Sequence, residues 1–295
     1  MAIKIVLAGG TGFIGSYLYK KYTAEGHQVL MVSRQPGHIS WKDEAALILA
    51  LEGAALVINL AGKPINCLFT EENKKALVAS RVNTTSAIGL AISKCIQPPA
   101  LWLNASGAHI YGTAGANGFT EQDPANGRPF PAVMAQAWEK AFFDCHLPAT
   151  RQVALRISVV LGKGGGVLQP FLLLTRLGLG GTQGSGQQIF SWIHIEDLYR
   201  ILQFVAEQDT ISGPINVSSP EPVSNKELMK TLRQVLHRPI GIPAPAWGIR
   251  LGGKLIGTEP ELLLDSIDVL PKALLDAGFT FQYPDIRSAL TDLVS

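Results

Sequence analysis

Several features are scarce in this chain of 295 residues. It has three cysteines, Cys67, Cys95 and Cys145, and their spacing is not that of metal ligands. We therefore expect free, packed thiols rather than disulfides or a metal site, and a protein of the reducing cytoplasm. No apolar run approaches the ~18 residues of a membrane span. The N-terminus already reads as a strand, so we expect no signal peptide.

Net charge is also small. Lysine and arginine number 25 against 23 acidic residues, which leaves a formal charge of +2. This balance implies no bulk attraction to nucleic acid or to a membrane surface. We expect a small-molecule substrate as the partner, and a monomer or homodimer. Hydrophobic residues make up 47% of the chain, which is enough to bury a large core.

Apolar strands alternate with amphipathic helices through the first 160 residues, which predicts an α/β fold with a Rossmann-type doubly wound parallel sheet. We expect residues 1–240 to form the dinucleotide-binding domain, with a substrate-lobe insertion at about 163–195. Residues 241–295 would form a small C-terminal substrate lobe over the sheet edge. The expected strands are 2–8, 28–33, 56–60, 101–105 and 153–157, and the expected helices are 13–26, 43–51, 71–80, 83–95, 133–145, 167–176, 196–207 and 225–237.

A glycine-rich turn joins the first strand to the first helix. Gly9, Gly12 and Gly15 have the spacing G-x-x-G-x-x-G, which suits a tight turn, close approach of a pyrophosphate and close packing of helix on strand. The helix N-terminus adds unpaired N–H donors. We therefore expect dinucleotide binding here, with a turn that holds no ligand as the alternative. The intervening residues Thr11, Phe13 and Ile14 belong to the same predicted cofactor site.

The second strand ends in Ser33 and Arg34, where an acidic residue would favour NAD. Arginine pairs bidentately with a 2′-phosphate and stacks on adenine, so this end favours NADP. The alternative is a solvated surface arginine. The third strand closes in Asn59-Leu60-Ala61-Gly62, four residues that we assign to the cofactor site because small side chains let the backbone lie against a ligand.

Together these two segments resemble extended short-chain dehydrogenases/reductases. Later segments resemble one branch, described as NAD(P)-dependent sugar-nucleotide epimerases with a C-terminal domain of unknown function, of which some members carry the name cell-division inhibitor. The segments are Ser80-Arg81, Trp138-Glu139, Gly178 to Gly181, Gly184 to Gly186, Ser191 to Asp197 and Pro271 to Phe281. The resemblance covers nearly the whole chain, implies an NADP-binding Rossmann fold, and places Arg81 beside the cofactor.

The catalytic pair of the wider superfamily is missing. That pair is Tyr-x-x-x-Lys, in which the lysine lowers the pKa of the tyrosine that moves a proton. The matching helix reads Val133 to Glu139 and has neither residue. Tyr17 and Lys21 have the spacing, but they lie in the first helix and we treat them as a chance match.

Three residues remain as catalytic candidates. Asn83 matches a helix-kinking asparagine that holds a water, with a helix N-cap as the alternative. Ser106 follows the strand at 101–105, near where a serine would bond a substrate carbonyl, although its spacing to Tyr111 is one residue too long. Tyr111 is the nearest phenol to that strand end. His109 reads as a loop residue.

Two other polar positions have a structural interpretation. Asp197 would cap the following helix, with His194 a satisfied, half-buried ring. Arg156, at a strand end, is a weaker choice than Arg81 for contacting an anion.

The function predicted by this pattern is an NADP-dependent oxidoreductase or epimerase acting on a small polar substrate, for instance a nucleotide-linked one. The alternative is a non-catalytic NADP(H)-binding regulator or redox sensor.

Overall fold

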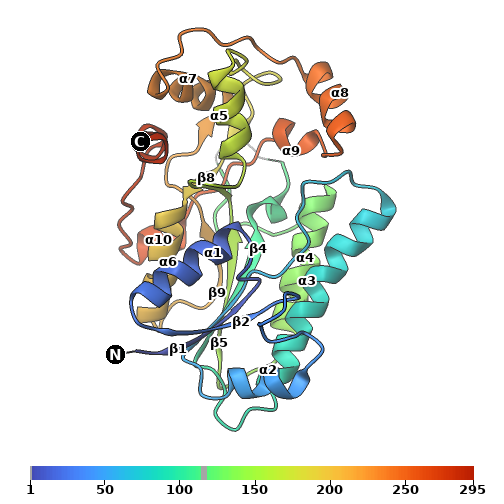
Figure 1. Ribbon diagram of the computed structural model, residues 1–295, viewed down its shortest axis with the longest axis vertical. Helices are drawn as coiled ribbons and strands as arrows, with labels where there is room; N and C mark the ends of the chain where they lie inside the picture. The colour runs from blue at the N-terminus through green and yellow to red at the C-terminus, as the bar shows by residue number, and fades with distance from the viewer. Residues whose placement is uncertain (1, 114–117) are drawn as a thin grey trace.

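The computed structural model describes residues 2–113 and 118–295, and its centre is a six-stranded parallel sheet (Figure 1). The strand order β2-β1-β3-β4-β5-β9 reverses direction between β1 and β3, which makes the carboxyl ends of these two strands the expected ligand crevice. This confirms the predicted doubly wound fold. The strands run, in sheet order, Gln28–Val32 (β2), Lys4–Ala8 (β1), Leu56–Asn59 (β3), Leu101–Gly107 (β4), Arg151–Ile157 (β5) and Gly213–Val217 (β9).

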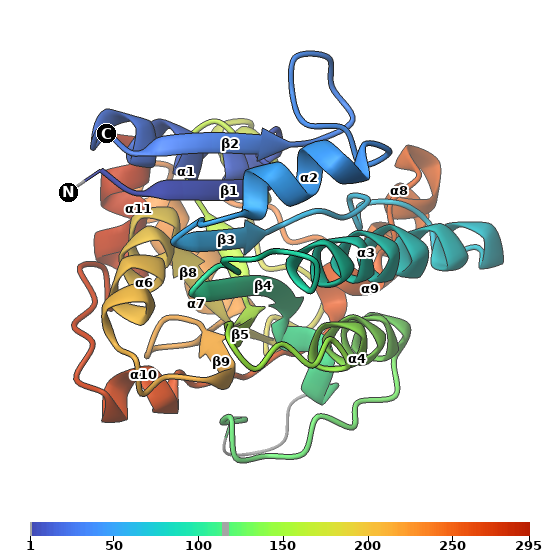
Figure 2. The ribbon, with the colours of Figure 1, turned by 90° about the horizontal axis from the view of Figure 1, so that it is seen from below.

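Helices cover both faces of this sheet (Figure 2). Alternate residues of a strand point to opposite faces, and the strands are apolar throughout because each face needs its own core. In β1, Ile5 and Leu7 pack on one face, whereas Val6 and Ala8 pack on the other. The first face carries α1 (Phe13–Ala24), α6 (Ile195–Glu207) and α10 (Lys272–Asp276), and the second carries α2 (Glu44–Leu51), α3 (Glu71–Ile92) and α4 (Phe130–Phe143).

A smaller lobe with its own core lies above the sheet in Figure 1. Its core joins segments on both sides of residue 240, so the domain boundary placed there stays a prediction. Two short strand pairs, β6 with β8 and β7 with β10, support it. Its elements are β6 (Val159–Leu161), α5 (Leu168–Arg176), β7 (Ile189–Phe190), β8 (Trp192–His194), β10 (Val223–Ser224), α7 (Asn225–Val235) and α11 (Ile286–Val294); α8 (Ala246–Ile256), α9 (Glu261–Leu264) and the 3-10 turn η1 (Ala108–Tyr111) complete the fold.

Four expected elements need correction. The two helices expected at 71–80 and 83–95 are one helix, α3, because no proline interrupts it, its one glycine, Gly89, is buried within it, and its buried positions recur every three or four residues. Asn83 is therefore not an N-cap. The strand expected at 101–105 continues to Gly107, so Ser106 lies inside β4 and does not follow it. The helix expected at 133–145 begins at Phe130.

Among the described residues, no helix has both the length and the apolar character needed to cross a membrane. The same part of the chain contains no group of three metal-ligating side chains. Cys67, Cys95 and Cys145 are free and half-buried, and burial raises the pKa of the last two.

Candidate functional site

The three glycines of the β1–α1 turn differ in what a larger side chain would meet at each position. Gly9 has a φ of +77°, and a Cβ there would lie 2.8 Å from the Ala61 nitrogen. A Cβ on Gly15 would lie 2.6 Å from the Cα of Gly10. Gly12, the N-cap of α1, differs because its Cβ would meet only the Gly9 oxygen, at 3.6 Å. The protein thus leaves room over Gly12, beside the first N–H groups of α1, and a phosphate fits this kind of space.

The other residues predicted for this turn lie in different environments. Thr11 is exposed, whereas Phe13 and Ile14 are half-buried. The Phe13 ring packs against the glycine loop that follows β6, since a Cβ on Gly165 would lie 2.4 Å from it. This contact connects the phosphate-side turn to the start of the upper lobe.

The end of β2 brings a third polar residue beside Ser33 and Arg34. The Ser33 hydroxyl is buried, lies 2.8 Å from Nδ1 of His38 and accepts a hydrogen bond from the Gln35 N–H. The chain folds back because the Ser33 N–H donates to the Ile39 carbonyl. Arg34 is exposed and takes part in none of the ion pairs among the described residues. Sequence reasoning missed His38, although the Pro-Gly turn before it signals the reversal.

A buried amide network fixes the segment after β3. The Asn59 side chain donates to Asn104 Oδ1 at 2.7 Å and to Thr85 Oγ1 at 3.1 Å, and its Oδ1 accepts the Ala61 N–H. Trp138 Nε1 also donates to Thr85, at 2.9 Å. Asn59 is fully buried, so it holds Ala61 against Gly9 and has no free group for a ligand. Leu60 is half-buried and Gly62 is exposed.

Arg81 is a buried cation without a carboxylate partner among the described residues. Its Nη1 donates to the carbonyls of Lys63 and Leu77, its Nε has no hydrogen bond, and its guanidinium lies 5.1 Å from the Trp138 ring centre. A Cβ on Gly62 would lie 3.2 Å from it. Burial lowers the pKa of Arg81 to about 10. An uncompensated buried charge of this kind is suited to an anionic ligand.

Ser106 belongs to a buried ion-pair cluster. Arg156 in β5 forms a bidentate pair with Glu139 of α4, at 2.9 Å and 2.8 Å. The Ser106 hydroxyl donates to the same carboxylate at 2.8 Å. All three side chains are more than nine-tenths buried, between the sheet and α4. Arg156 therefore pairs internally, and Ser106 has no free hydroxyl hydrogen for a substrate.

Tyr111 is held by the other end of Arg156. Its hydroxyl accepts from Arg156 Nη1 at 2.7 Å and donates to Asn216 Oδ1 at 2.8 Å, and its ring stacks on Phe119. The ring is buried, and burial raises the pKa of Tyr111 despite the nearby arginine. Both hydrogen-bonding positions of the phenol are thus occupied by the protein.

Asn83 lies away from these groups. It is exposed in the middle of α3, whereas Arg81 and Thr85, two residues to either side, are buried. The full α4 helix, now from Phe130, still contains no Tyr-x-x-x-Lys. Tyr17 and Lys21 both hydrogen-bond to Glu196 of α6, which gives them a structural role between helices.

The assignments at the start of α6 are reversed. His194, not Asp197, is the N-cap, and its Nδ1 accepts the Glu196 N–H at 3.1 Å. Asp197 is fully buried and accepts the N–H groups of residues 282 and 283. The His194 ring is buried rather than half-buried, and its Nε2 lies 3.4 Å from Asp292 without a hydrogen bond among the described residues.

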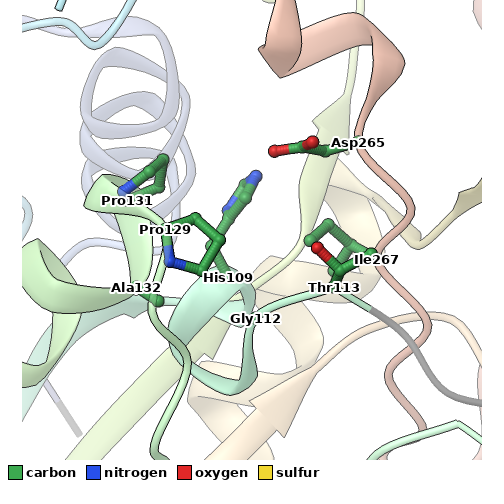
Figure 3. Close-up of a pocket in the computed structure, with 8 residues that line it drawn as sticks. All are labelled: His109, Gly112, Thr113, Pro129, Pro131, Ala132, Asp265 and Ile267. Atoms are coloured by element: carbon green, nitrogen blue, oxygen red, sulfur yellow. The ribbon is translucent and has the colours of Figure 1, made fainter.

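A small hollow that is open to solvent follows β4. His109 of η1 points across it toward Asp265, which follows α9 (Figure 3). Pro131, in the first turn of α4, forms a side wall. Burial lowers the pKa of His109, and burial together with Glu261 and Glu259 raises the pKa of Asp265. Sequence reasoning set His109 aside as a loop residue and missed Asp265, which lies 156 residues later in the chain.

Comparison with known proteins agrees with this architecture. Residues 5–218 match the NAD dependent epimerase/dehydratase family, and residues 244–293 match a domain of unknown function, DUF1731. The chain belongs to the NAD-dependent epimerase/dehydratase family. The family match confirms the resemblance to extended short-chain dehydrogenases/reductases and the Rossmann fold.

Relatives of similar length come from distant organisms. The epimerase family protein SDR39U1 of Mus musculus is 36% identical over 99% of this chain and 100% of its own length. Epimerase family protein YfhF of Bacillus subtilis is 35% identical, with 99% and 98% covered. The human SDR39U1 crystal structure with NADPH superimposes with a TM-score of 0.89 at 35% identity, and 98% of each chain is covered. The similarity therefore spans both the sheet and the upper lobe.

Proposed function

We propose that this member of the family is an NADP(H)-dependent oxidoreductase or epimerase acting on a small polar substrate. The room over Gly12 carries this proposal, because the protein itself does not require a glycine there, whereas a pyrophosphate at the helix N-terminus would. The buried cation Arg81, which has no carboxylate partner among the described residues, gives a second anchor for an anionic group. The NADPH bound in the human relative supports the choice of cofactor.

The strand order supports one direction for the bound dinucleotide. With the 2′-phosphate at Ser33 and Arg34 on β2 and the pyrophosphate over Gly12 beside β1, the nicotinamide extends over β3 toward β4. The bound nicotinamide would supply hydride transfer, and the chain's own residues would bind the phosphates and orient the substrate. The hollow that follows β4 lies at this end.

A titration of NADPH and NADH, followed by fluorescence, tests the cofactor. A charge-assisted pair between Arg34 and the 2′-phosphate contributes roughly 1.5–3 kcal/mol, which corresponds to about tenfold to a hundredfold tighter binding of NADPH. Arg34→Ala should remove most of this preference. Arg238→Ala, an exposed arginine on the upper lobe, serves as the control and should retain it. Equal affinities of the wild type for the two cofactors would contradict the assignment.

The pyrophosphate position has its own test. Gly12→Val should abolish NADPH binding while the fold remains, because the branched side chain fills the space over the helix N-terminus. Circular dichroism and thermal unfolding report on the fold. Binding within a few-fold of the wild type would show that the dinucleotide lies elsewhere.

A non-catalytic NADP(H)-binding regulator is the second candidate, favoured by the state of the predicted catalytic groups. The hydroxyls of Ser106 and Tyr111 are committed to protein partners, and α4 lacks the tyrosine–lysine pair. Oxidation of NADPH with a panel of aldehydes, ketones and quinones separates the two functions. Tight NADPH binding without any turnover favours the regulator. Turnover that survives Ser106→Ala and Tyr111→Phe places the proton donor elsewhere.

A further inference from the structure

The end of β4 opens into space that none of the described side chains fills. A Cβ on Gly107, the last residue of the strand, would meet nothing within 4 Å. The next residues form η1 and carry His109 to the hollow described above. Its eight lining residues come from η1 and the residues after it, the start of α4 and the segment after α9. Three separate parts of the chain thus converge at the edge of the sheet where the nicotinamide is expected.

His109 and Asp265 are the two titratable side chains among those eight lining residues. The remaining six are one glycine, one threonine, two prolines, one alanine and one isoleucine, and they add no charge. Figure 3 shows the imidazole directed into the hollow, with the carboxylate on the opposite side. A polar substrate group between them would meet an imidazole on one side and a carboxylate on the other.

The other candidates near this edge are already occupied. Ser106 donates to Glu139, Tyr111 is bonded to Arg156 and Asn216, and Asn83 is exposed on α3. His109 has no hydrogen bond of its imidazole to another described side chain in this structure, and its ring is available to a ligand in the hollow. Among the described residues, this leaves His109, with Asp265 across the hollow, as the candidate for acid–base chemistry in this region.

We propose that His109 exchanges a proton with the reacting oxygen of the substrate, and that Asp265 faces it across the same hollow and stabilises the imidazolium. The inference rests on the proposed oxidoreductase or epimerase function. It assigns the proton-transfer role that the absent tyrosine–lysine pair leaves open. Histidine is suited to this work because its pKa lies close to neutral pH.

The proton balance suits a substrate that carries a secondary alcohol. In oxidation the O–H bond of the alcohol breaks and its proton goes to His109, while the C–H bond breaks and its hydride goes to the oxidised nicotinamide dinucleotide. The oxygen electron pair then forms the carbonyl π bond. In the reverse step the carbonyl carbon regains the hydride and His109 returns the proton to oxygen. Return of hydride to the opposite face completes an epimerisation with no net change in His109 or in the dinucleotide.

The environment of His109 favours the oxidation step, in which the imidazole accepts the alcohol proton. Burial lowers its pKa below the ordinary value, so the ring is neutral at pH 7 and ready to accept a proton. The carboxylate of Asp265, on the other side of the same hollow, would then offset the new positive charge. A neutral resting histidine therefore suits an enzyme that begins by oxidising its substrate.

Histidine NMR on the full-length protein tests the position of His109 without a known substrate. The chain has six histidines, and His109→Gln assigns the relevant signal. Oxidised NADP carries a positive nicotinamide ring and NADPH a neutral one. A unit charge about 6 Å away changes a histidine pKa by about 0.5 to 2, for an effective dielectric between that of water and that of a protein surface. We expect the pKa of His109 to be lower by at least about 0.5 with oxidised NADP than with NADPH.

An internal control and one further variant make the outcome decisive. The NMR signals of the His38 ring, beside Ser33 at the adenosine end, should be the same with both forms, because the 2′-phosphate is the same. Asp265→Asn should lower the pKa of His109. A His109 pKa that is equal with both cofactors, or unchanged in Asp265→Asn, overturns the assignment while cofactor binding stands. Absence of NADP(H) binding by the wild type refutes the proposed function and this inference with it.

Discussion

The buried pair between Glu139 and Arg156 gives a prediction whose size follows from its burial. The two side chains are only 9% and 5% exposed, and the carboxylate also accepts the Ser106 hydroxyl. Glu139→Gln keeps the shape but leaves the guanidinium without its counter-charge. Breaking one partner of a buried pair costs about 3–5 kcal/mol. For 295 residues, with an unfolding entropy of about 2.1 cal/mol/K per residue, Tm falls by about 5–8 °C.

The same helix offers a matched control. Lys140 and Asp144 form an i,i+4 pair that is 75% and 61% exposed. An exposed helix pair contributes about 0.3–0.5 kcal/mol, so Asp144→Asn should lower Tm by less than about 1 °C. Both variants replace an acidic side chain by the corresponding amide, and both positions belong to α4 or its C-cap. The main difference between them is the burial of the ion pair.

Differential scanning calorimetry of the cofactor-free protein measures both effects. The double variant Glu139→Leu/Arg156→Met, which removes both charges, should recover most of the loss, because apolar residues of similar volume replace buried ion pairs at little net cost. Equal Tm losses for Glu139→Gln and Asp144→Asn would refute the reasoning. A double variant that is less stable than Glu139→Gln would show that the cluster stabilises the fold through geometry rather than through charge compensation.

Three further predictions follow from other parts of the structure. Gly15→Ala should destabilise the fold, because its Cβ would lie 2.6 Å from Gly10, whereas Gly12→Ala should be far milder; similar losses in thermal unfolding would contradict the packing argument. Arg81→Met removes a buried cation that has no carboxylate partner among the described residues, so the Tm of the cofactor-free protein should stay unchanged or rise. The same variant should weaken NADPH binding at least about tenfold in a fluorescence titration. Lower stability with unchanged affinity would argue against a ligand-binding role for Arg81. Burial lowers the pKa of His194, although Asp292 opposes it, so the unfolded state binds a proton more readily and stability is lost as pH falls below about 6.5. Between pH 7.5 and 5.5 the Tm of His194→Gln should therefore fall less than that of the wild type, and equal falls would exclude this contribution.

Local sequence patterns were enough to predict much of the fold. The glycine spacing from Gly9 to Gly15, the apolar strand before it and the helix after it all lie close together in the chain. Each of these local patterns indicates one backbone conformation, namely a tight turn, a strand or a helix. The alternation of strands and helices then requires a parallel sheet covered on both faces. The same motifs led to the family that the comparison confirms.

Element boundaries were less accessible to sequence reasoning. The continuity of α3 through Asn83 depends on a buried inner face that includes Arg81 and Thr85, which are polar residues that a hydrophobic pattern does not register as core. Likewise, β4 extends through Ser106 because its neighbour β5 pairs with it along its whole length.

The sequence by itself therefore determined the strand–turn–helix unit, the sheet class and the expected cofactor end, because these depend on residues close together in the chain. Tertiary structure alone decided which polar groups are free. Glu139 pairs with Arg156 across helix and strand, and this pairing engages Ser106 and Tyr111. His109 faces Asp265 only because the segment after α9 returns to the edge of the sheet. Hydrogen-bond partners and burial are set by packing between distant segments, and neither is encoded in local spacing.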